Sequence, residues 1–147
     1  MSDVAIEQPA PGKAPWHLWL VGILSFLWNV WGAWVTVQAQ TGAAMDMDAN
    51  EIAHYAEQPL WVVVLTDFAF AAAILGALAL LIRSRRAPPL YLLSIAAIVA
   101  SAVGDVVRGS ALLLQQADWL TLFLTTTGLA VVQWLYARWI GKRGVLR

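Results

Sequence analysis

The sequence predicts an all-α integral membrane protein, an up-and-down bundle of four transmembrane helices. Two observations lead to this prediction. The 147 residues are 61% hydrophobic and only 12% charged, with a mean hydropathy of +0.68, whereas about a quarter of the residues of a soluble domain are charged. In addition, the chain contains four apolar runs, each meeting the length of about 20 residues that crosses a hydrocarbon core. These runs are 16–40, 60–82, 90–114 and 119–140.

Lysine and arginine residues are sorted to one side of this four-span arrangement. Eight of the nine lie before the first span, between the second and third spans, or near and after the end of the fourth: Lys13, Arg83, Arg85, Arg86, Arg138, Lys142, Arg143 and Arg147. The 41–59 loop on the opposite side has none. Because basic loops stay cytoplasmic, we expect both termini inside and the 41–59 loop outside.

Three segments lie outside the spans. Residues 1–15 contain three prolines and are expected to form a disordered cytoplasmic tail, and residues 141–147 a basic one. In the 41–59 loop, Asp48 followed by Glu51 is typical of a capping box, which predicts a short periplasmic helix that ends before Pro59. We expect Ile52, Tyr55 and Ala56 of this helix to face the bundle or the lipid headgroups.

The first span has two different faces. Small or weakly polar residues recur at spacings of three and four, and bulky tryptophans occupy the other side. The first set is Gly22, Ser25, Asn29, Gly32 and Thr36, and the second is Trp28, Trp31 and Trp34. In lipid, faces of small residues pack against neighbouring helices. The third span carries a similar stripe of small residues, Ser94, Ala97, Ser101 and Gly104.

Three charged residues lie within the spans, and helical rise places them in the outer half of the membrane. Asp67 is expected about 10 Å, Arg108 about 9 Å and Asp105 about 14 Å below the outer end of their spans. A charge at the centre of a span costs about 2.5 to 3.5 kcal/mol, so we expect the three to face inward and meet. The same depth brings Asn29, Thr36 and Thr125 toward them.

This cluster has two interpretations. It forms a proton, cation or polar-solute site that opens outward, or it is an ionic staple between the second and third helices. The sequence also leaves two roles for the whole protein: transport of a small solute or protons, or a non-transporting accessory or scaffold subunit of a larger membrane complex. In both cases we expect a homo-oligomer or a larger assembly within the bilayer, and no nucleic acid as a partner.

Several kinds of chemistry find no motif in this chain. It has no cysteine, no GxSxG, no phosphate-binding loop and no HExxH. Glu51, His54 and Glu57 follow one another at spacings of three, but such residues drift around a helix and do not converge on one ion. We therefore expect no enzyme activity, no cofactor and no metal.

The segments APWHLWLVGILSFLWN, WGAW, QTG, PLWVV, LLIRSRRA and YARWIGKRGVLR resemble a family of small, uncharacterised bacterial inner-membrane proteins with four spans, sometimes automatically labelled sugar transporters. The resemblance extends from Pro15 to Arg147 and implies the four-span fold and its location. Members usually carry an acidic and an aromatic residue where this chain has Val35 and Thr36. The small multidrug exporters have a similar length, but their first span contains a glutamate and their charge is nearly unbiased.

Overall fold

A computed structural model of the protein describes residues 14–43, 47–109 and 116–147, with side chains in the last segment described from Leu120 onward. Every regular element in these segments is an α-helix, which confirms the all-α class. The helices are α1 (Trp16–Gln40), α2 (Ala49–Ala56), α3 (Leu60–Leu81), α4 (Ala87–Arg108) and α5 (Gln116–Lys142). By length and composition α1, α3, α4 and α5 can each cross a membrane, as a multi-pass membrane protein requires.

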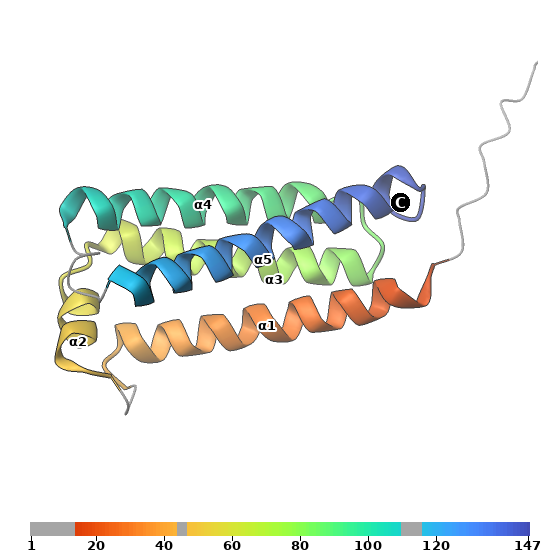
Figure 1. Cartoon of the computed structure of the whole chain (residues 1–147). Coiled ribbons are helices and arrows are strands. Elements are labelled where there is room, and N and C mark those ends of the chain that lie inside the picture. The colour runs from red at the N-terminus through yellow and green to blue at the C-terminus, as the bar shows by residue number, and fades with distance from the viewer. Residues whose placement is uncertain (1–13, 44–46, 110–115) are drawn as a thin grey trace, which may run out of the picture.

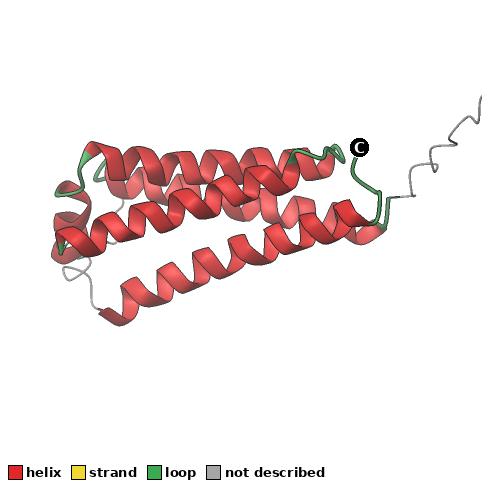
Figure 2. Cartoon of the chain, turned by 90° about the horizontal axis from the view of Figure 1, so that it is seen from above, coloured by secondary structure: helices red, strands yellow, loops and turns green. Residues whose placement is uncertain are grey.

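The four long helices run back and forth beside one another, and the short α2 lies across one end of the bundle (Figures 1 and 2). We call this end the α2 end and the opposite one, where the C-terminus lies, the terminal end. Helix α3 packs against both α1 and α4, and α4 also packs against α5. Consecutive spans are therefore neighbours, as their short connections favour.

The third span is shorter than its apolar run. It begins at Ala87 and ends at Arg108, where Gly109 takes a left-handed conformation (φ 74°) that closes the helix. The predicted span continued to residue 114, and residues 110–115 lie outside the described part of the chain. Arg108 is thus the last residue of α4 and does not lie one or two turns inside it.

The two faces predicted for the first span are confirmed, except that Trp28, expected on the outer side, also lines a cavity within the bundle. Gly22, Ser25 and Asn29 are buried, whereas Trp31 and Trp34 are 65% and 59% exposed. A Cβ added at Gly22 would lie 2.5 Å from Cδ2 of Leu81 on α3, so a larger residue at this position would require the leucine side chain to move.

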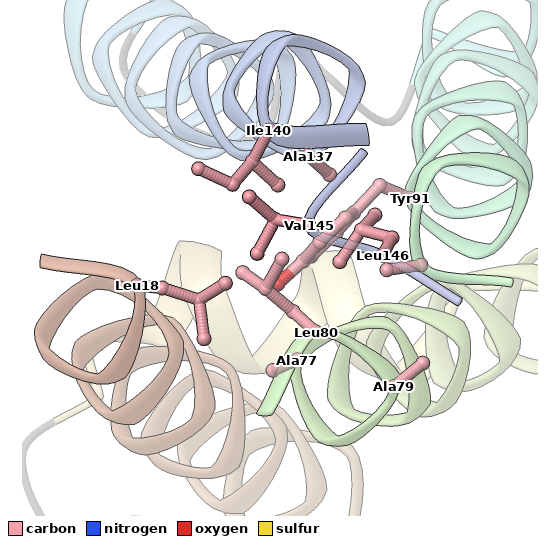
Figure 3. Close-up of a cluster of buried hydrophobic side chains, with 10 residues drawn as sticks. Leu18, Ala77, Ala79, Leu80, Tyr91, Ala137, Ile140, Val145 and Leu146 are labelled. Carbon is pink, nitrogen blue, oxygen red and sulfur yellow. The ribbon is translucent and has the colours of Figure 1, made fainter. Parts of the chain in front are cut away.

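An apolar core fills the terminal end (Figure 3). Its residues come from all four long helices and from the chain after α5: Leu18, Ala77, Ala79, Leu80, Ala87, Tyr91, Ala137, Ile140, Val145 and Leu146. Gly76 lies beneath the Tyr91 ring, where an added Cβ would stand 3.2 Å from two ring atoms. The alternation of alanine with large side chains allows the helices to interlock closely at this end.

The end of the chain packs into this core, which the prediction of a basic tail did not anticipate. Gly144 adopts φ 70°, and the chain turns back so that Val145 and Leu146 are 5% and 2% exposed. The Arg147 N–H then donates to the Arg83 carbonyl oxygen at 2.7 Å, and Arg83 Nε donates to the Val145 carbonyl oxygen at 3.0 Å. We call residues 144–147 the C-terminal clasp. It ties the end of α5 to the α3–α4 connection.

Candidate functional site

A cavity of about 150 Å³ lies in the α2 half of the bundle. All four long helices and the α2 region contribute polar side chains to its wall: Asn29, Thr36, His54, Gln58, Thr66, Ser94, Ser101, Asp105, Thr126 and Gln133. Aromatic and aliphatic side chains form the remainder. A space of this size accommodates several water molecules or one small organic molecule.

The structure brings three residues of the predicted cluster together at this cavity, namely Asn29, Thr36 and Asp105. Asp105 is 8% exposed, on the buried face of α4. It lies three residues, or about 4.5 Å, from the end of its helix, much closer than the expected 14 Å. The difference arises because α4 stops at Arg108. Asp105 therefore sits at the mouth of the cavity and not deep within it.

The predicted meeting of Asp67 with Asp105 and Arg108 must be corrected. Asp67 is exposed and is not among the residues that line the cavity. It shares an outward face of α3 with Val64, Ala71 and Leu75, at spacings of three and four. We expected this charge to turn inward within a single bundle. The rotation of α3 about its axis is instead set by its buried alanines, and this rotation places Asp67 on the outer surface.

Arg108 and Thr125 also depart from the expected cluster. Arg108 is exposed, and its guanidinium donates to the backbone carbonyl of Glu57 beyond the helix end. A long side chain at the last residue of a helix reaches that carbonyl without entering the bundle. Thr125 is exposed, and its neighbour Thr126 lines the cavity in its place, because one residue turns the side chain by about 100°.

Helix α2 is held by the capping box that the sequence predicts. Asp48 Oδ1 accepts from the Glu51 N–H at 2.8 Å, and Glu51 Oε2 accepts from the Asp48 N–H at 2.9 Å. Tyr55 lines the cavity and so faces the bundle as expected, whereas Ile52 is 53% exposed, and His54, which was not among the expected residues, is only 3% exposed. The sequence could not reveal that His54 is buried and Ile52 exposed, because isoleucine is more apolar than histidine.

A chain of polar contacts connects α2 to the cavity mouth. Gln58 Nε2 lies 3.2 Å from His54 Nε2 and 3.4 Å from Asp105 Oδ1. An amide nitrogen only donates, so His54 accepts at Nε2 in this contact. Burial, followed by the negative charges of Glu51 and Asp105, raises the pKa of Tyr55 above its usual range, so this phenol remains protonated at neutral pH.

At the deeper end of the cavity, Asn29 of the predicted cluster lies beside Gln133 and Ser94, which were not part of it. Asn29 Nδ2 donates to the Ser25 carbonyl oxygen at 2.7 Å and to Gln133 Oε1 at 3.3 Å. Ser94 is 1% exposed, and within the described part of the chain its hydroxyl has no hydrogen-bond partner. Ser94 follows the same helical face as Asp105, at intervals of seven and four residues through Ser101, a spacing that could have indicated its inclusion.

The cavity thus combines one carboxylate with amides and hydroxyls, inside a segment that otherwise suits lipid. Its groups can hold a polar molecule by hydrogen bonds and charge. Among the described residues, no group of three or more His, Cys, Asp or Glu side chains is arranged to hold a metal ion.

In comparisons with known proteins, no family model matches the chain, and no curated protein or solved structure is significantly similar to it. Functional proposals for this protein therefore rest on its own residues and geometry.

Proposed function

We propose that this protein admits a small polar solute or protons into the cavity at its α2 end and moves them across a bacterial inner membrane. The observation that supports this proposal is the cavity itself, to which all four long helices contribute polar side chains. Polar groups within membrane-spanning segments are costly, and they typically mark a path for solutes or ions.

The proposed orientation places the α2 end outside the cell and both termini in the cytoplasm. Eight of the nine lysine and arginine residues belong to the terminal end, and the 41–59 loop has none. The cavity would then receive its solute from the periplasm. The apolar core and the C-terminal clasp close the cytoplasmic end, so transport requires this end to open while the α2 end closes.

Two aspartates in the spanning helices make a matched test of this proposal. Asp105 lines the cavity, whereas Asp67 is exposed on α3 and does not. Proton flux and uptake of small solutes would be measured in proteoliposomes containing the wild-type protein, Asp105→Asn or Asp67→Asn. We expect flux in the wild type, its loss in Asp105→Asn and its retention in Asp67→Asn. Equal flux in the two variants would contradict the role given to the cavity.

A second candidate function is an accessory or scaffold role, and the exposed position of Asp67 favours it. A carboxylate about 10 Å along a membrane-spanning helix and facing outward is expensive in lipid. A neighbouring helix of another subunit, in a homo-oligomer or a larger complex, would shield it. Asp67→Leu would then weaken copurification of the assembly in mild detergent, and Asp105→Leu would not. The reverse result would contradict this role.

A further inference from the structure

The chemistry of the cavity wall points to a class of ligand. We propose that the solute is a small organic cation with a protonated amine, which binds with its ammonium group at Asp105 and its apolar part among aromatic rings. This inference rests on the proposed function of the cavity and adds the charge of what enters it.

The charge of the cavity wall favours a cation. Asp105 is the one acidic residue among the described residues that line the cavity, and no lysine or arginine lines it with them. His54, which also lines the wall, accepts a hydrogen bond from Gln58 at Nε2. The space therefore carries a net negative charge, with walls of low polarity that strengthen its attraction for a cation.

Several polar side chains of the wall already use their hydrogen-bond donors within the protein. The Thr66 and Ser101 hydroxyls donate to carbonyls of their own helices, at 3.0 and 3.1 Å. Asn29 likewise uses its amide nitrogen within the protein, as does Gln58. These four residues therefore offer the cavity oxygen lone pairs and not donors. A ligand that matches them must bring its own N–H or O–H donors, and an ammonium group brings three.

One hydroxyl in the cavity wall lacks a hydrogen-bond partner. The Ser94 hydroxyl, 1% exposed and lining the cavity, has no hydrogen-bond partner among the described residues. A buried hydroxyl without a partner is costly, so a polar group from a ligand or from water belongs beside it.

The wall of the cavity also contains aromatic rings. Trp28, Phe70 and Phe123 all line the cavity and come from three different helices. Aromatic faces attract ammonium groups and also accept an alkyl chain. A polyol would leave several of its own hydroxyl oxygens facing lone pairs or rings, and an anion would meet the Asp105 carboxylate. Both are weaker matches than an alkylammonium ion.

The test uses three probes with one four-carbon skeleton and different charge: butylammonium, 1-butanol and butyrate. Their binding to the purified full-length protein in lipid nanodiscs would be measured by isothermal titration calorimetry, with glycerol as a neutral polyol. We expect butylammonium to bind about tenfold or more tightly than each of the other three. Tighter or equal binding of butanol, butyrate or glycerol would overturn the inference.

Variants connect this binding to the cavity. Asp105→Asn is expected to weaken butylammonium binding by about thirtyfold, because it removes one partner of a buried charge pair. Trp28→Leu keeps apolar bulk and removes the ring, with an expected loss of about threefold to tenfold. Asp67→Asn is the matched control and should bind like the wild type. Circular dichroism and gel filtration of each variant check folding, and Trp28→Leu remains informative if Asp105→Asn does not fold.

The outcomes separate this inference from the proposed function. Binding of glycerol or butanol that Ser94→Ala and Trp28→Leu weaken would overturn the cation inference and leave a solute cavity in place. Absence of binding by all four probes, together with absence of flux, would overturn both. Butylammonium binding lost in Asp67→Asn and retained in Asp105→Asn would place the site on the outer face of α3 and overturn the assignment to the cavity.

Discussion

The same four helices form the α2 half and the terminal half of the bundle, and they pack in opposite ways. At the terminal end, alanines and glycines alternate with leucine, isoleucine and tyrosine, and the C-terminal clasp fills the space that remains (Figure 3). At the α2 end, serines, threonines and amides line a cavity of about 150 Å³. The comparison teaches that apolar packing is concentrated at one end of this small bundle and that polar side chains gather toward the other.

A similar contrast exists between the two aspartates of the spanning helices. Asp105 is buried on α4 and receives a hydrogen bond from Gln58, whereas Asp67 is exposed on α3. Their local sequences are both apolar, so composition gives no sign of the difference. It follows from the rotation of each helix, which places one carboxylate in the cavity and the other on the outer surface.

The largest effect is expected from a charge in the terminal half. Leu146→Asp would place a carboxylate among the apolar side chains of the clasp site, where Leu146 is 2% exposed. We expect a loss of about 3 kcal/mol or more in the free energy of unfolding, since the substitution removes the apolar contacts of Leu146 and takes a carboxylate out of water. Denaturant unfolding in detergent micelles measures it. Arg147→Gln, which keeps the backbone hydrogen bonds of the clasp, should remain near the wild type.

A smaller loss is expected when the packing of the terminal half is loosened. Leu80→Ala removes a side chain that is 1% exposed and should cost about 2 to 5 kcal/mol. Leu78→Ala, two residues earlier and 42% exposed, should change stability by about 0.5 kcal/mol or less. Thermal unfolding of both variants checks the difference. Equal losses would contradict the placement of Leu80 in the apolar core and of Leu78 on the outer surface.

At the deep end of the cavity, one truncation should behave in the opposite way. Ser94→Ala removes a buried hydroxyl that has no partner among the described residues, so stability is expected to stay constant or rise by about 1 kcal/mol. The same variant should weaken ligand binding in the cavity. Thermal unfolding without ligand tests this expectation. A clear loss of stability would show that the hydroxyl already has a bound water as its partner.

The smallest effect concerns the pH dependence of Tyr55 on α2. Burial, followed by the charges of Glu51 and Asp105, raises the pKa of Tyr55 above its ordinary value of 10.0. Its contribution to stability is therefore complete below pH 10 and is lost as the pH rises through the pKa of the folded state. Comparing the ultraviolet phenolate titration of the wild type with that of Tyr55→Phe isolates this phenol. In Asp105→Asn its midpoint should fall slightly, and a rise would contradict the proximity of the two groups.

Much of the fold could be predicted from this sequence. Runs of apolar residues longer than 20 indicated four helices, and the small-residue stripe of α1 indicated its buried face. The capping box of Asp48 and Glu51 indicated α2. These features are local, because helix length, periodicity and capping depend on residues a few positions apart.

The candidate site was less predictable. Asn29, Thr36 and Asp105 were identified from depth and helical face, and they do line one cavity. Asp67 was misplaced because a rule for isolated charges in lipid was applied to a helix whose rotation is fixed by its neighbours. His54 and Gln58 were missed because their contribution depends on α2 folding over the end of the bundle.

By itself, the sequence determined the number of long helices, their approximate bounds and the side of each helix that is small enough for close packing. Only the tertiary structure decided which carboxylate is buried, that α4 ends at Arg108, and that the last residues close the terminal end. The physical reason is the range of the interactions. Hydrophobicity and helical periodicity act along the chain, whereas the rotation of a helix and the partner of a polar group are set by residues that lie close only after folding.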